Sequence, residues 1–359
     1  MKKVGIISMQ RIINYGSFLQ AYGLKVTLEE IGCEVVFLDY NYEGALISED
    51  NKIKVVYKKI LRALKTKNYI KAKKNFNNFK YQINCALNEI GVNEKKYQSD
   101  IECLVIGSDE VFNCLQGYPV GYSKALFGKG FENIPVISYA ASFGFTTLDK
   151  LKKYGIDKEI GKMLSNFKDI SVRDNNSELI VKDLIKRKPQ KHLDPVLISN
   201  YPQAIKEECK LKKFIIIYAY NGRLKEKEEK EIRKIAKKLD KKIVSIGFYQ
   251  AVADINITCH PLAVFDYFRK ADFVITDTFH GTVFSIKMNT PFCTLIRLSN
   301  ANKLTTLLEQ LCLKERAITD IKQVMELFYK KMDFSKTNDI LEQERKRSIG
   351  YLMNNIIES

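Results

Sequence analysis

The segment with the most specific chemical pattern surrounds His280, one of three histidines in the chain. An apolar run that predicts a buried strand ends at Thr276, and Gly281 follows His280 where a helix is expected to begin. The first turn of a helix favours a bound anion, because its N–H groups have no partner within the helix. A histidine there can contact a phosphate or transfer a proton, and Asp277 could orient it. We predict His280 and Asp277 as catalytic and place Gly281 and Thr282 in the anion site; a purely structural histidine is the alternative.

A second polar group, Asn14-Tyr-Gly-Ser17, stands between the first apolar run and the first helical stripe. Asn14 and Ser17 can cap a helix, and Gly16 allows a close approach of the backbone to a ligand. The free N–H groups of this turn could bind an anion. An ordinary capped turn explains the segment equally well, so both interpretations stay open.

A third group, Gly107-Ser108-Asp109-Glu110, follows the apolar run at 103–106. Small polar and acidic residues at the end of a strand suit a general base or contacts with substrate hydroxyls. We predict Asp109 as catalytic and expect Ser108 and Glu110 to bind a hydroxyl-bearing substrate. Helix capping would account for the same residues.

An arginine, Arg173, emerges where the short apolar run at 170–172 ends. Its planar guanidinium can hold a carboxylate or a phosphate with two parallel hydrogen bonds, which lysine cannot do. We predict that Arg173 binds an anionic substrate. The competing interpretation is a structural salt bridge, to Asp174 or between domains.

The elements that must position these residues alternate between apolar strands and amphipathic helices, which favours parallel sheets covered by helices. The expected strands are 4–9, 34–40, 103–106, 135–140, 170–172, 214–218, 242–247, 273–276 and 292–296. The expected helices are 18–31, 148–167, 175–186, 225–239, 263–270, 281–288, 302–312 and 325–357.

Periodicity lapses between 192 and 208, where Pro195 and Pro202 interrupt the pattern, and this predicts a domain boundary. We expect an N-terminal domain at 1–200 with a basic helical insertion at about 50–98, a C-terminal domain at 201–335 and a C-terminal helix at 336–359. The fold class is therefore α/β, with two Rossmann-like domains facing a cleft. Ligands of open parallel sheets bind beyond the carboxyl ends of the strands.

Composition narrows the class of protein. No run approaches the 18 to 20 apolar residues of a membrane span, and the short apolar run at 4–9 favours a buried strand over a signal peptide, so we expect a cytoplasmic protein. Eight cysteines without a C-x-x-C pair predict small buried residues and no metal site. The net charge of +17, concentrated at 52–96 and 225–242, favours anionic partners, although solvated helix faces would also explain it.

These segments, in this order, resemble the polysaccharide pyruvyl transferase family, and the resemblance covers nearly the whole chain. The matching pieces are Asn14-Tyr-Gly-Ser-Phe-Leu-Gln-Ala-Tyr22, Ile106-Gly-Ser-Asp-Glu-Val111 with Asn113, Tyr139-Ala-Ala-Ser-Phe-Gly144, Ser171-Val-Arg-Asp174, Leu193-Asp-Pro195, the run 271–285, and Arg297 with Asn302-Lys303. Glu110 and Phe112 stand where the family often has Gln and Trp, and Asp174 stands where it often has Glu.

The resemblance implies transfer of the pyruvyl unit of phosphoenolpyruvate onto two hydroxyls of a hexose, with release of phosphate, on a fold similar to GT-B-like glycosyltransferases. Arg173 and His280 match positions associated with the donor. Donor binding would then involve Arg173 together with the residues of two helix starts, Asn14, Gly16, Ser17, Gly281 and Thr282, and acceptor binding would involve Ser108 and Glu110. No cofactor is certain, and a divalent cation on the phosphate stays open.

The expected partners are phosphoenolpyruvate and a sugar or lipid-linked oligosaccharide of a cell-envelope polysaccharide, with no nucleic acid. Peripheral contact with an anionic membrane and the oligomeric state stay open. Two rival functions are a glycosyltransferase that uses a nucleotide sugar on the same fold, and a non-enzymatic binder of an anionic polymer or membrane.

Overall fold

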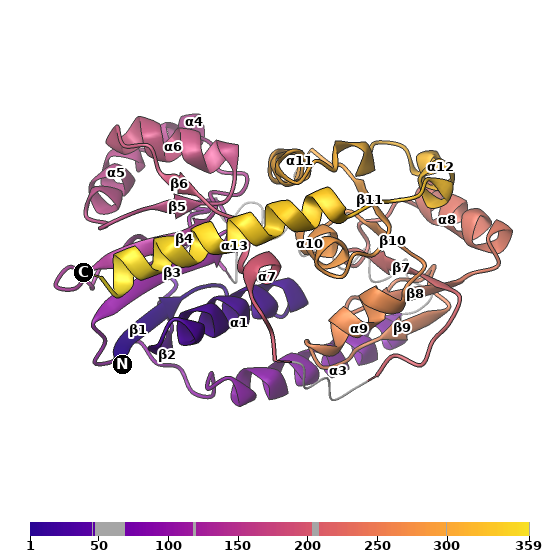
Figure 1. The fold of residues 1–359 in the computed structure, drawn as a ribbon, viewed down its shortest axis with the longest axis horizontal. Helices are drawn as coiled ribbons and strands as arrows, with labels where there is room; N and C mark the ends of the chain where they lie inside the picture. Colours follow the sequence, from indigo (N-terminus) through magenta and orange to yellow (C-terminus); the bar gives the residue numbers. More distant parts are fainter. Residues whose placement is uncertain (45, 47–68, 118–119, 203–207, 299, 359) are drawn as a thin grey trace.

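The computed structural model describes residues 1–44, 46, 69–117, 120–202, 208–298 and 300–358. They form two parallel sheets of six strands, one in each half of the molecule (Figure 1), which confirms the α/β prediction. The first sheet has the order β2 (Cys33–Leu38), β1 (Lys2–Ile7), β3 (Cys103–Asp109), β4 (Val136–Ala141), β5 (Ser171–Val172) and β6 (Gln190–Lys191). The second has the order β12 (Ala317–Ile318), β11 (Phe292–Leu295), β10 (Phe273–Thr276), β7 (Phe214–Tyr218), β8 (Lys242–Ile246) and β9 (Ile255–Ile257).

The strands are apolar throughout because both faces of each sheet are covered. In β7, Phe214 and Ile216 belong to a core that continues from one domain into the other, whereas Ile215 and Ile217 face the opposite layer. The strands β6, β9 and β12 were not predicted. With two or three residues each, they are too short to show a period.

Helices cover both layers of each domain. In the first domain α1 (Tyr15–Glu30) and α7 (Pro195–Ile198) pack together, and α4 (Leu148–Lys153), α5 (Asp157–Ser165) and α6 (Asn175–Ile185) lie on the other side of the sheet. In the second domain they are α8 (Glu226–Lys238), α9 (Ala263–Lys270), α10 (Phe279–Lys287), α11 (Ala301–Gln310) and α12 (Val324–Tyr329). The single helix expected at 148–167 is wrong, because Gly155 at φ +67° separates α4 from α5.

Two long helices tie the domains together. The C-terminal helix α13 (Ser335–Ile356) runs from the second domain back across the first (Figure 1), where the Tyr351 hydroxyl donates to the Ser138 carbonyl at 2.9 Å. The helix α3 (Tyr69–Glu89) belongs to the first domain, yet its Asn75 amide donates to the Gly247 carbonyl at 2.6 Å. It lies within the basic insertion predicted at about 50–98, of which residues 50–68 lie outside the described residues.

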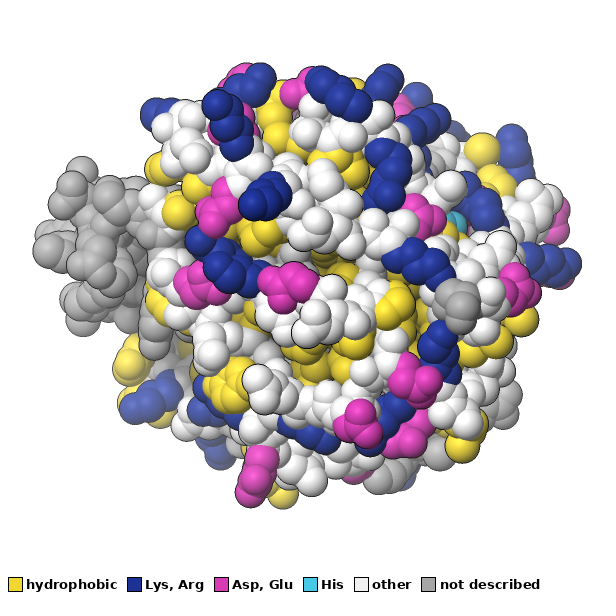
Figure 2. All heavy atoms as spheres, turned by 90° about the vertical axis from the view of Figure 1, so that its left-hand side faces the viewer, with side chains coloured by type: hydrophobic (Ala, Val, Ile, Leu, Met, Phe, Trp, Pro, Cys, Tyr) yellow, Lys and Arg dark blue, Asp and Glu magenta, His cyan; other side chains and the backbone are white. Residues whose placement is uncertain are grey.

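Lys and Arg side chains do not form one continuous basic patch on the face drawn in Figure 2, since Asp and Glu side chains lie among them. Six of the eight cysteines are buried and all eight are free thiols, as small buried residues would be. Over the described ranges, no helix combines the length and the apolarity that crossing a membrane requires.

Candidate active site

A cavity of about 350 Å³ lies between the domains, beside the carboxyl ends of β1, β3, β7 and β10. Polar side chains from three of the four predicted strand-end segments line it, together with apolar residues from both domains. The predicted residues on its wall are Asn14, Ser17, Asp109, Glu110, Asp277 and His280. Segments that are far apart in the sequence thus meet at one cleft, as expected for open parallel sheets.

The N-termini of two helices, one from each domain, meet at this cavity. Asn14 caps α1 by accepting from the Gly16 N–H at 2.8 Å, and Thr278 caps α10 by accepting from the Gly281 N–H at 2.9 Å. The His280 ring packs directly on Gly16, where a Cβ would stand 2.1 Å from its Cγ and Nδ1 atoms. Because Gly16 has no side chain, the histidine of the other domain can contact α1.

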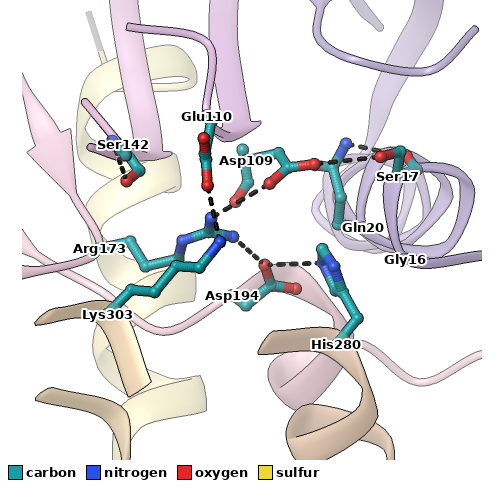
Figure 3. A network of polar contacts seen from close by, with 12 residues as sticks. Gly16, Ser17, Gln20, Asp109, Glu110, Ser142, Arg173, Asp194, His280 and Lys303 are labelled. Carbon is teal, nitrogen blue, oxygen red and sulfur yellow. Dashed lines mark hydrogen bonds and ion pairs between the residues drawn. The ribbon is translucent and has the colours of Figure 1, made fainter. Parts of the chain in front are cut away.

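Asp194, not Asp277, is the carboxylate beside His280. Its Oδ2 atom lies 3.6 Å from His280 Nε2 (Figure 3), an ion-pair distance, and among the described residues that nitrogen has no partner at hydrogen-bond distance. Asp194 is fully buried. Burial opposes its ionisation, but the neighbouring His280 and Arg173 outweigh this and lower the pKa of Asp194. The predicted orienting role of Asp277 is therefore wrong.

Arg173 lies behind the cavity wall and is held by two carboxylates. Its guanidinium donates to Asp194 at 2.7 Å and to Asp109 at 3.1 Å, and it stacks on the Phe279 ring at 4.1 Å from the centroid. Only 2% of its side chain is exposed. Burial favours the neutral form, yet Asp109 and Asp194 raise the pKa of Arg173. Each terminal nitrogen of the predicted anion binder thus already donates to a carboxylate of the protein.

Asp109 and Glu110 differ in their cationic partners. Asp109 pairs with Arg173 and accepts a hydrogen bond from the Ser17 hydroxyl at 3.1 Å. Glu110 accepts from Lys303 at 2.6 Å, a lysine on α11 of the other domain (Figure 3). Burial acts against ionisation at both, but these cations lower the pKa of each carboxyl group.

Asp277 faces a separate pair of arginines. Its Oδ2 atom lies 3.0 Å from Arg223 Nε and 3.4 Å from Arg297 Nε, while Oδ1 is buried and has no hydrogen-bond partner in the part of the chain that the structure describes. Despite the arginines, burial raises the pKa of Asp277. Of the carboxylates on the wall, Asp277 is therefore the better suited to take up a proton.

Three predicted site residues serve the scaffold and do not line the cavity. The Ser108 hydroxyl donates to the Ala140 carbonyl at 3.1 Å, and the Thr282 hydroxyl lies 2.8 Å from that of Thr294; both side chains are fully buried. A Cβ at Gly281 would stand 2.1 Å from Thr276 Oγ1, so Gly281 lets α10 start tightly against β10.

Sequence reasoning did not single out Asp194, Lys303 or Tyr220 as site residues. Asp194 directly precedes Pro195 after a two-residue strand. An Asp-Pro pair after a strand was the feature of the sequence that could have indicated Asp194 as a site residue. Tyr220 accepts from the Asn14 amide at 3.0 Å across the cleft. Nothing in the order of residues announces that Lys303, on an ordinary helix, faces Glu110.

His192 lies in the interior, not in a surface loop. It sits between the rings of Tyr139 and Tyr351, and its Nδ1 atom is 2.8 Å from the Ser171 hydroxyl. Burial lowers the pKa of His192 to about 3. It is therefore a neutral structural histidine away from the cavity.

Across the described ranges, no three His, Cys, Asp or Glu side chains cluster as metal ligands do. The carboxylates that line the cavity, Asp109, Glu110 and Asp277, are each paired with a cation.

The paired sheets and the interdomain cavity define a two-domain protein with the GT-B-like fold. Solved structures with this fold include the glycotransferase of kitacinnamycin (8% identity, 99% of each chain, TM-score 0.50) and the UDP-GlcNAc 2-epimerase from Neisseria meningitidis bound to UDP-GlcNAc (11%, all of both chains, 0.51). The UDP-GlcNAc 2-epimerase from Methanocaldococcus jannaschii is similar as well (11%, 98% of this chain and 100% of the other, 0.52). At these identities the similarity shows the fold alone.

The family model described as polysaccharide pyruvyl transferase matches residues 14–299. The chain belongs to this family and is a transferase, which confirms the resemblance and replaces the alternative of a non-enzymatic binder. A search of curated proteins finds no match.

Proposed function

We propose that the protein transfers the pyruvyl group of phosphoenolpyruvate onto a sugar of a cell-surface polysaccharide precursor, forming a ketal and releasing phosphate. The observation that supports this most directly is the His280–Asp194 pair at the meeting point of two helix N-termini. Helix N-termini favour a phosphate or carboxylate, and an imidazole beside a carboxylate can be oriented to transfer a proton to such a ligand.

Lys303 and Arg223 provide the positive charge on the cavity wall. The donor carries about three negative charges, so it needs cations as well as N–H groups. Arg173 contributes indirectly by holding Asp194 and Asp109 in place. A divalent cation bound with the phosphate would add to this charge, and phosphate release measured with and without Mg²⁺ tests that option.

The reaction needs one proton on the methylene carbon of the donor. Two sugar hydroxyls then bond to the adjacent carbon as its bond to the phosphate oxygen breaks. Of the two hydroxyl protons released, one balances the new methyl group and the other leaves with the phosphate. We assign His280 as the acid and Asp277 as a proton acceptor, because burial raises the pKa of Asp277. Asp109 and Glu110 would accept hydrogen bonds from the sugar hydroxyl groups.

The acceptor would be a nucleotide-linked or lipid-linked sugar on the cytoplasmic side of the membrane. The deciding experiment mixes the protein with phosphoenolpyruvate and a panel of such sugars and measures phosphate release. In parallel, thermal unfolding is followed with phosphoenolpyruvate and with UDP-sugars. Stabilisation by UDP-sugars alone, without phosphate release from phosphoenolpyruvate, would instead identify a glycosyltransferase.

A further inference from the structure

A second hollow of about 310 Å³ opens beside the active-site cavity. We call it the tyrosine pocket; its wall includes Tyr40, Tyr42, Tyr97, Arg11, Asp39 and Lys95. It lies where β1 and β2 end, on the first domain only. No residue predicted from the sequence as part of a site lines it, so the proposed reaction leaves it without a role.

The tyrosine pocket adjoins the active-site cavity. Met9, Ile12 and Val120 line both hollows, so the two share part of their walls. A ligand longer than one sugar ring could therefore place one end in each.

The charge of the tyrosine pocket is largely cancelled. Arg11 forms a two-pronged ion pair with Asp39, with Nη2 donating to Oδ2 at 2.9 Å, and Nη2 also donates to the Glu94 carbonyl at 2.7 Å. The Lys96 N–H further anchors Asp39 at 2.9 Å. Among the described residues of this wall, Lys95 is the one other cation, and a pyrophosphate would meet an arginine that is already paired with a carboxylate. This electrostatic balance suits a neutral ligand with many hydroxyl groups.

The tyrosine side chains of the pocket indicate which shape of ligand would fit it. Tyr97 is 38% exposed and Tyr42 is 42% exposed, while Tyr40 is more deeply placed with its hydroxyl 3.5 Å from the Met9 sulfur. A tyrosine offers an apolar ring face together with a polar edge. The C–H face of a pyranose can stack on such rings, and its hydroxyls can form hydrogen bonds with the Arg11–Asp39 pair.

We propose that the tyrosine pocket is a carbohydrate subsite that holds the sugar next to the one modified in the active-site cavity. This inference rests on the proposed pyruvyl transfer for its biological meaning, but the binding itself does not require a donor. The enzyme would then recognise an acceptor of at least two sugars.

The chain has no tryptophan, which permits a direct test. A Tyr97→Trp protein carries one indole in the tyrosine pocket and is titrated, without phosphoenolpyruvate, with lactose, maltose and the methyl glycosides of glucose, galactose, mannose, N-acetylglucosamine and N-acetylmannosamine. We expect at least one sugar to change the emission saturably. Tyr154→Trp is the matched control, because Tyr154 is 41% exposed but lines neither hollow, and its emission should not change.

Removing a second ring tests whether stacking is responsible. In the Tyr97→Trp background, Tyr42→Ala should weaken sugar binding by about threefold or more, and Tyr42→Phe should restore it. No response to any of the sugars overturns the proposal. Phosphate release by the wild-type protein is measured separately. Sugar binding without phosphate release would support the subsite and contradict the proposed function. Phosphate release without sugar binding in the tyrosine pocket would support the proposed function and contradict the subsite.

Discussion

At the scale of single residues, the cations near the cavity already have carboxylate partners. Arg173 faces Asp109 and Asp194, and Lys303 faces Glu110. A donor with three negative charges must displace a carboxylate from its cation or bind together with protons. His280 lies on the wall next to Asp194, and it is the side chain that we assign to transfer a proton to the donor.

Replacing His280 should therefore affect the reaction more than the binding of the donor. We expect His280→Ala to lower the rate of phosphate release by about 10² to 10⁴, the usual cost of losing an acid or base. His280→Gln should keep donor affinity better than rate. The matched control is His260→Gln, because His260 does not line the cavity. Near-normal phosphate release by His280→Ala would remove this residue from the mechanism.

Asp194 acts through His280, so its substitution should lower the rate of phosphate release more than the affinity for the donor. In Asp194→Asn, His280 loses its neighbouring negative charge and Arg173 loses one of its two carboxylates. We expect kcat to fall while the KM for phosphoenolpyruvate changes little. Phosphate release measured over a range of donor concentrations checks this. An equal effect on kcat and KM, matched by lower thermal stability, would show a structural role alone.

At the scale of elements, the site depends on how closely the N-terminus of α1 approaches that of α10. Gly16 and His280 make this contact, and each helix keeps its own cap at Asn14 and Thr278. Because the two helices come from different domains, the contact also sets the relative position of donor-binding groups.

A methyl group at residue 16 should disturb this contact. Gly16→Ala places a Cβ 2.1 Å from the His280 ring, so the ring or the whole of α10 must move. We expect at least a tenfold loss of activity, since small misplacements of reacting groups are costly.

The matched control for Gly16→Ala is Gly350→Ala within α13, where nothing lies within 4 Å of the new Cβ and helix propensity predicts about 0.5 to 1 kcal/mol of added stability. Equal activity of both variants would contradict the packing argument.

At the scale of the whole molecule, α13 closes the structure by returning to the first domain. Its residue Tyr351 covers His192, and Leu352 and Ile356 are buried in the core that both domains share. The stability of the protein should therefore depend on the protonation of a histidine that does not line the active-site cavity.

Burial, with a smaller effect of Arg347, lowers the pKa of His192 to about 3, against about 6.5 in an unfolded chain. Below pH 6.5 the unfolded state takes up a proton that the folded state excludes, so the free energy of unfolding falls as the pH decreases. This group should account for about 2 kcal/mol between pH 7.5 and pH 5.

Urea unfolding of the wild-type and His192→Asn proteins at both pH values measures it. We expect the variant to be less stable at pH 7.5 but to lose about 2 kcal/mol less on acidification. Identical losses in the two proteins would show that His192 can be protonated in the folded state.

The sequence by itself determined the layered α/β architecture, since apolar runs and helical stripes are local patterns that each segment carries alone. It also determined that polar residues follow these runs, as Asp109, Asp277 and His280 do, because the end of a strand is visible in the order of residues. Parallel strands then bring such positions to one edge of the sheets. The cleft could therefore be predicted.

Only the tertiary structure decided which side chains pair. Asp194 and not Asp277 faces His280, Lys303 faces Glu110, and His192 is enclosed by α13. These contacts join segments far apart in the chain and depend on how the two domains dock. Side-chain direction at a domain interface is set by packing across it, and no single segment contains that information.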